Sequence, residues 1–247
     1  MTATPVRDDA GVWLFARYAY PPNDLGFCGP PGSVAPAGAP TADRVAALRA
    51  AARQFSGAWH YLVVLSEMAG LDDPLDRRVV ESYWLGGGLV ANVDGVEFGR
   101  RLLDRIGPQA GHYWAHLTPA LLPEAAADHG FHVFGVYPWT RLLRTGPVEP
   151  PMTVLDGCRI RPATVTARDG ARVTVSVRPL TWDGVRLGLG ASETVEVEDR
   201  DAVPGDVVAL HWGRTCGRLD PVQATGLEQN TLRRIDITNS RLARERG

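Results

Sequence analysis

The segment GDVVALHWG (205–213) has the pattern of a buried β-strand that ends in a histidine. Uninterrupted apolar residues follow its Gly-Asp pair, which is typical of a strand covered on both faces. His211 stands at the end of this run. Two interpretations are open: a core histidine satisfied by a backbone carbonyl, or a ligand that meets a second group from elsewhere in the chain. The neighbouring segments decide what that second group can be.

Short segments of the same character precede this strand. They are rich in β-branched residues and comprise RIRPATVTA (159–167), ARVTVSVR (171–178), VRLGL (185–189) and ETVEVE (193–198). Asp-Gly pairs at 169–170 and 183–184 favour tight hairpins between some of them. Several short strands at this spacing predict a small β-barrel.

A different pattern occupies the first part of the chain. Its apolar residues recur with helical periodicity, as in the segment 41–55, where Thr41 can cap a helix. TGPVEPP (145–151) has the composition of a linker. The sequence therefore predicts an α+β protein with three parts. These are a mainly helical domain (1–145), a small OB-like β-barrel with a C-terminal helix (152–235), and a polar tail (236–247).

Composition excludes several classes of function. The chain has no lysine, so its 26 basic residues are all arginines, and neither a lysine Schiff base nor a P-loop phosphate site can form. A net charge of −2 argues against nucleic acid as a partner. The sequence shows no membrane span and no signal peptide. Three widely spaced cysteines do not form a secreted disulfide framework, which favours free thiols and a cytoplasmic location.

Two motifs in the β-rich part resemble a known family. Cys158-Arg159-Ile160-Arg161-Pro162 resembles the start of the HypC/HupF family of hydrogenase maturation chaperones, which has a proline four residues after its cysteine. The runs 205–208 (GDVV) and 210–213 (LHWG) resemble the G-D-[YW]-V and V-H-V-G motifs of that family, and RLD (218–220) opens the last helix. The likeness covers roughly residues 157–235, or about a third of the chain. It implies a HypC-like barrel, although Cys158 is internal and the family cysteine is N-terminal.

The resemblance implies a metal site and a role. In the family, the cysteine and the histidine hold a low-spin iron with cyanide and carbonyl ligands and pass it to the large subunit of a [NiFe] hydrogenase. Cys158 and His211 would be the ligands here, and Cys28 is a candidate third thiol if its Gly/Pro loop folds over the barrel. The expected partner is a hydrogenase maturation factor or the large subunit. For a shared metal, Sγ of Cys158 should lie within ~5 Å of a ring nitrogen of His211.

Two alternatives remain open. Four histidines of the helical domain have a spacing suited to a metal or a haem in a metal-dependent enzyme: His112 and His116 (i, i+4), and His129 and His132 (i, i+3). Their aromatic neighbours equally suit a packed core. The second alternative is an interaction module that has kept the barrel and lost its ligands, and Cys216 is interpreted as structural in either case.

The whole chain also resembles an uncharacterised bacterial family that is common in actinobacteria. The blocks that carry this likeness are RYAYPPN (17–23), GFCGP (26–30), DPLDRRVVE (73–81) and FHVFGVYPW (131–139). This resemblance implies no activity.

Overall fold

A computed structural model of the chain describes residues 9–27, 29–32, 41–106 and 116–245. Its first part is helical, as predicted. The helical elements before the sheet are α1 (Ala10–Asp24), α2 (Ala42–Ala52), α3 (Ser56–Met68), α4 (Arg77–Leu85), η1 (Gly88–Asn92), α5 (Gly95–Ile106), η4 (Pro119–Glu124), α6 (His129–Phe131), the π-helical turn η5 (His132–Val136), α7 (Trp139–Leu142) and α8 (Glu149–Cys158). Within the described part of the chain, no helix has the length and apolar character that a membrane crossing requires.

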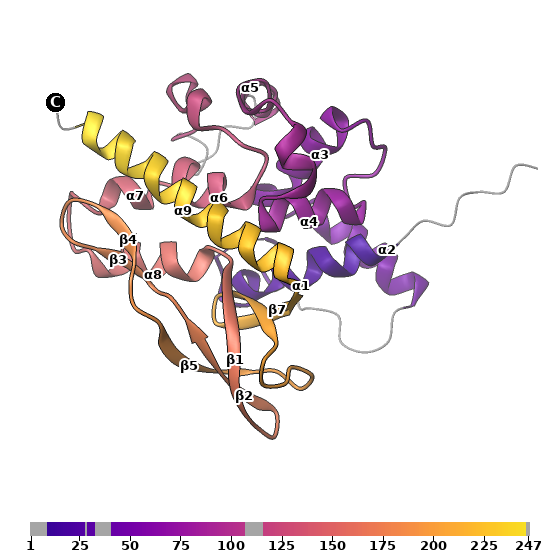
Figure 1. Cartoon of the computed structure of the whole chain (residues 1–247). Helices are drawn as coiled ribbons and strands as arrows, with labels where there is room; N and C mark the ends of the chain where they lie inside the picture. The colour runs from indigo at the N-terminus through magenta and orange to yellow at the C-terminus, as the bar shows by residue number, and fades with distance from the viewer. Residues whose placement is uncertain (1–8, 28, 33–40, 107–115, 246–247) are drawn as a thin grey trace, which may run out of the picture.

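The predicted β-rich part is an antiparallel sheet below the helices (Figure 1). Its strands are β1 (Arg161–Asp169), β2 (Arg172–Val177), β5 (Glu193–Glu198), β6 (Val207–His211) and β7 (Arg214–Leu219). They are paired in the order β5-β2-β1-β6-β7, while β3 (Leu180–Trp182) and β4 (Leu187–Leu189) form a separate hairpin. Both predicted Asp-Gly pairs lie in hairpin turns, because Asp169 pairs with Arg172 and Trp182 pairs with Leu187.

The prediction of a closed barrel is wrong for the described strands. The edge strands β5 and β7 are not paired with each other in the sheet order, and only a side-chain hydrogen bond from Thr215 to the carbonyl of Glu198 joins them, at 3.4 Å. Alternate residues of β2 face inward and pack with residues of β1, β5 and β6 in a small apolar cluster. The cluster covers one face of the sheet. The β-rich part therefore has a buried core although its sheet does not close into a barrel.

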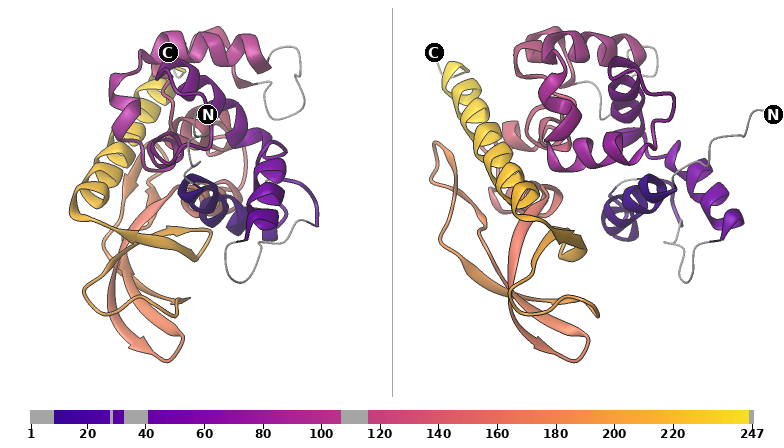
Figure 2. Two further views of the ribbon diagram at one scale, coloured as in Figure 1. Left: turned by 90° about the vertical axis from the view of Figure 1, so that its right-hand side faces the viewer. Right: turned by 45° about the vertical axis from the view of Figure 1, so that its right-hand side comes forward.

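The last helix is longer than the sequence predicts. α9 runs from Pro221 to Arg244 and begins with a capping box between Asp220 and Gln223. It does not end at residue 235 but continues through most of the segment predicted as a polar tail (236–247). Polar residues of this last part are buried because their hydrogen bonds are satisfied: the Asn239 amide group bonds both backbone groups of Leu187. Despite its polar composition, this segment is therefore part of a helix that packs between the strands and the helical part (Figure 2).

Helix α8 occupies a segment for which the sequence predicted other structure. The segment 145–151, predicted as a linker, includes the start of α8, whose prolines lie in its first turn, where a missing N–H costs no hydrogen bond. Cys158 is the last residue of this helix, and β1 begins only at Arg161, two residues after the start of the predicted strand segment 159–167.

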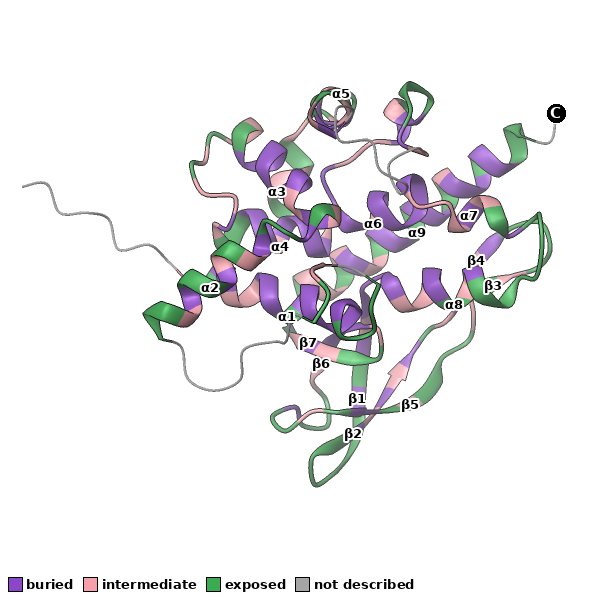
Figure 3. Ribbon diagram, turned by 180° about the vertical axis from the view of Figure 1, so that it is seen from behind, coloured by how far each residue is buried: buried purple, intermediate pink, exposed green. Residues whose placement is uncertain are grey.

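The helical part and the sheet share one apolar core. Ile160, Ala209 and Leu219 from the β-rich part belong to the same cluster as the aromatic residues of α1, α3 and α4. Buried residues accordingly concentrate where α1, α4 and α6 meet β6 and β7 (Figure 3). The candidate site lies at this junction.

Candidate metal centre

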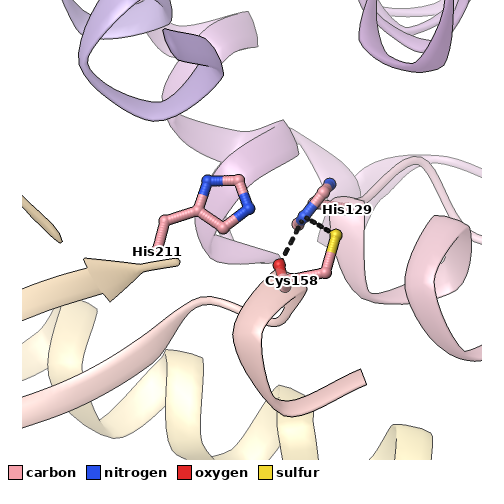
Figure 4. A group of neighbouring side chains, drawn as sticks. All are labelled: His129, Cys158 and His211. Carbon is pink, nitrogen blue, oxygen red and sulfur yellow. Dashed lines mark hydrogen bonds between the residues drawn. The ribbon is translucent and has the colours of Figure 1, made fainter. Parts of the chain in front are cut away.

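Three buried side chains from distant parts of the chain converge at the junction of helices and sheet (Figure 4). They are His129, Cys158 and His211, and their ligand atoms all lie within 4.8 Å of one another. Each is at most 4% exposed. One thiol and two imidazoles supply three donor atoms of the kind that bind zinc, iron or copper.

His129 is held by a network that reaches helix α9. It is the first residue of α6, which Asp128 caps by accepting a hydrogen bond from the backbone N–H of Phe131 at 2.7 Å. The other carboxylate oxygen of Asp128 accepts from Arg234 of α9 at 2.9 Å, and both side chains are buried. Such a buried, hydrogen-bonded ion pair fixes the position of the α6 N-terminus relative to α9.

Trp212 ties the segment of His211 to the segment of Cys158. It lies with Gly213 in the tight turn between β6 and β7, and both have left-handed backbone conformations, with φ of 51° and 71°. The backbone N–H of Trp212 donates to the carbonyl of Gly157 at 2.8 Å. Its ring lies so close to Gly157 that a Cβ there would be 2.9 Å from the ring, and it stacks on Phe27. Trp212, which has a strained backbone conformation, therefore connects the segment of His211 to the segment of Cys158.

His211 has the tautomer of a metal ligand. Its Nδ1 lies 2.7 Å from the carbonyl oxygen of Tyr18, and a carbonyl only accepts, so Nδ1 carries the proton. Nε2 therefore carries the lone pair; it faces the backbone of Cys158 but has no hydrogen bond of ordinary geometry among the described residues. A buried imidazole oriented by a backbone carbonyl, with its other nitrogen unpartnered, is the arrangement found in metal-ligating histidines.

His129 has two hydrogen-bonding states available. In the geometry of the structure its Nε2 is 2.9 Å from the carbonyl of Cys158 and must donate, while Nδ1 accepts from the Tyr83 hydroxyl at 3.2 Å. Tyr83 can instead donate to the carbonyl of Gly57, 3.3 Å away, and accept from Nδ1. That second state frees the Nε2 lone pair, which lies 3.8 Å from Sγ of Cys158. In that state His129 keeps its hydrogen bond to Tyr83 but gives up the one from Nε2 to the Cys158 carbonyl, so ligation requires Nε2 to turn from that carbonyl towards the metal.

The histidines at the site are neutral. Burial lowers the pKa of His129 to about 4, against the weaker opposing effects of the Cys158 carbonyl and Asp128. Burial, followed by the proximity of His129, also brings the pKa of His211 well below its usual value, and the same two causes act on His132. Metal binding requires neutral imidazole, so protons do not compete at these nitrogens near pH 7.

A small cavity adjoins the three side chains. Its volume is about 20 Å³, and its walls include His129, Cys158 and His211 together with His132. The remaining wall residues are mainly apolar: Ala19, Pro22, Phe55, Gly57, Ala58, Tyr83 and Trp84. This volume accommodates about one water-sized molecule.

The structure brings together some of the residues singled out from the sequence and separates others. Cys158 and His211 lie within the ~5 Å that a shared metal requires. Cys28 and His112 lie outside the described residues, and their roles stay predictions. Among the residues that are described, His116 is not in the group, and His132 lines the cavity without belonging to it. Cys216 is buried next to the backbone of His211 but lies outside the group, and burial raises the pKa of its thiol.

His129 as the partner of Cys158 and His211 was missed. The sequence places it with the other helical histidines, because spacing relates residues only within one element. The three residues lie in α6, α8 and β6, and no local motif connects these segments. The one local signal is Asp128, a helix cap directly before it, which fixes the start of α6 but does not indicate what that turn faces.

Tyr83→Phe is expected to weaken metal binding about tenfold, because the loss of a group that orients a ligating histidine typically costs 10–100-fold in affinity. We expect the lower end, since Tyr83 bonds His129 in either tautomer. The substitution removes only a hydroxyl from a fully buried ring, so the fold should persist. A competition titration with a chromophoric chelator measures the effect, and unchanged affinity would contradict the role of Tyr83.

Comparisons with known proteins identify the family and nothing beyond it. The chain belongs to a family described as a family of unknown function (DUF6390), which matches residues 7–245. No curated protein and no solved structure matches the chain.

Proposed function

We propose that this member of the DUF6390 family binds one transition-metal ion through Sγ of Cys158 and the Nε2 atoms of His129 and His211. The observation that carries the proposal is the unpartnered Nε2 of His211, which is fully buried, has the tautomer of a ligand and lies within 4.8 Å of the other two donors. A buried polar atom without a partner costs free energy, and coordination of a metal would remove that cost.

The donor set narrows the choice of metal. A thiolate with two imidazoles suits zinc, iron or copper and does not suit magnesium or calcium, which prefer oxygen ligands. Three protein ligands leave one position open on a tetrahedral ion, as in zinc sites that take part in chemistry.

Titration of the chelator-treated protein with cobalt(II) tests the proposal. We expect saturation at one ion per chain, a thiolate-to-cobalt charge-transfer band in the near ultraviolet, and visible bands of the intensity typical of four-coordinate cobalt. Zinc should displace the cobalt and abolish the spectrum. Failure to bind either ion would leave the chain without a metal function and would favour the interaction module.

A more specific version of the proposal is a carrier of an iron fragment for hydrogenase maturation. The likeness of 158–162 and 205–213 to the HypC/HupF motifs supports it, together with the proximity of Cys158 and His211. The cavity of about 20 Å³ is smaller than an iron with cyanide and carbonyl ligands, so this version requires the surrounding side chains to move apart on loading. The partner would be a maturation factor or the hydrogenase large subunit.

Infrared spectroscopy separates the two versions. Protein purified anaerobically from a hydrogenase-competent host should show cyanide and carbonyl stretches that vanish in Cys158→Ala if it carries the fragment. A silent infrared spectrum from a protein that still holds a metal would rule out the iron fragment and leave the simpler metal site.

A further inference from the structure

We infer that the metal at this site keeps its fourth coordination position for one exogenous ligand of one or two non-hydrogen atoms, bound in the cavity between the metal ligands and His132. The inference rests on the proposed metal site. It adds a binding site and a class of ligand: molecules of the size of water or cyanide, and not organic substrates.

The cavity lies directly beside the candidate ligands. All three of them line it, so an ion bound between them would border on the cavity. A tetrahedral ion with three protein donors directs its remaining position away from them. Among the residues that the structure describes, none supplies a fourth sulfur, nitrogen or carboxylate donor to the group.

The size and lining of the cavity select the ligand. About 20 Å³ holds one water-sized molecule and excludes a ring or a branched group. Ala19 and Phe55 offer the ligand only apolar contact, whereas Trp84 has a buried Nε1–H that has no hydrogen-bond partner among the described residues. His132 is a buried polar residue of the wall that lies outside the group of candidate ligands. Such a wall favours a small ligand that loses its hydration shell when it binds the metal.

Gly57 offers a way to fill the cavity without changing a ligand. It lies in the first turn of α3 and lines the cavity without belonging to the group of candidate ligands. A Cβ at this position would lie 3.1 Å from Nε2 of His132, so a methyl group narrows the space beside that ring. The backbone of Gly57 is helical, and alanine is favoured over glycine in a helix.

Cyanide binding to the cobalt(II)-loaded protein tests the inference. We expect about one equivalent of cyanide to shift the visible cobalt bands while the thiolate band persists, and imidazole to cause no shift, because its ring exceeds the cavity. Gly57→Ala should keep the thiolate band and bind cyanide at least about tenfold more weakly, since a methyl group added to a filled space is destabilising.

Gly226→Ala is the matched control. Gly226 is also helical and half-buried, but a Cβ there meets nothing within 4 Å, so its cyanide affinity should equal that of the wild type. Absence of the thiolate band in the wild type would refute the metal site itself. A normal thiolate band with no cyanide shift, with an equal shift by imidazole, or with unchanged cyanide affinity in Gly57→Ala would each overturn the fourth-ligand inference alone.

Discussion

Cys158→Ser is expected to lower the affinity for zinc and cobalt(II) by at least about 100-fold and to abolish the thiolate-to-cobalt band. Loss of a group that merely orients a ligand costs 10–100-fold, so loss of the ligand itself should cost more. Serine keeps the size and burial of the side chain but offers a hydroxyl that stays protonated and is a poor ligand for these ions. The measurement is a chelator competition titration with the absorption spectrum recorded at each step.

Cys216→Ser is the matched control for this prediction. Cys158 and Cys216 are equally buried, each at 2%, and both substitutions replace a buried thiol by a hydroxyl. Only Cys158 belongs to the three-residue group, so Cys216→Ser should bind metal as the wild type does. Equal metal binding by the two variants would show that the thiol of Cys158 is not a ligand.

Cys28→Ser examines the ligand predicted from the sequence. The residues on either side contact the surroundings of the site: Phe27 stacks on Trp212, which follows His211, and Gly29 packs against Phe55 of the cavity wall. A lower intensity of the thiolate band in Cys28→Ser would add a second thiolate to the three donors. An unchanged band would restrict the site to those three.

Local patterns predicted the fold class and much of the β-rich part. The helical first part, the antiparallel strands, the Asp-Gly hairpins and the last helix are confirmed, because each depends on periodicity or on a turn motif within a few residues. The extent of α9 was not predictable in this way. Its last turns are buried through hydrogen bonds of Asn239 and Arg241 to distant segments, and such partners leave no trace in local composition.

In the candidate site, too, local motifs indicated some of the residues, while another depends on long-range contacts. The motifs around Cys158 and His211 indicated that two residues far apart in sequence could meet, and the structure places them together. His129 completes the group from α6, whose start is joined to α9 by the ion pair between Asp128 and Arg234, residues far apart in the chain. A third ligand that depends on such a long-range contact requires the tertiary structure.

The chelator-treated protein is expected to lose stability steeply as the pH falls from 6.5 towards about 4. His129 has a pKa of about 4 in the folded chain, whereas an unfolded histidine has a pKa near 6.5. Between these values the unfolded state takes up a proton that the folded state does not, so lower pH favours unfolding. His132 and His211 have pKa values shifted in the same direction by the same cause.

The size of this effect follows from the shift. A difference of 6.5 − 4 = 2.5 pKa units corresponds to about 3 kcal/mol for His129 alone, at 1.36 kcal/mol per unit. A typical domain has only about 5–15 kcal/mol of total stability, so the loss is a large part of it. The effect fades above pH 6.5, where the unfolded histidine also becomes neutral, and His129 adds little further loss below its folded pKa.

Urea unfolding at pH 7, 6 and 5 measures the prediction where ordinary carboxylates, with pKa values near 4, contribute little. The free energy of unfolding should fall by about 1.4 kcal/mol per pH unit for each histidine that is buried and neutral. Three such histidines give a slope too steep for one surface histidine to produce. A free energy that stays constant from pH 7 to 5 would mean that these rings are accessible to protons in the folded chain. Because a ring that water can protonate in place is not sealed in the core, that result would also contradict the buried metal site.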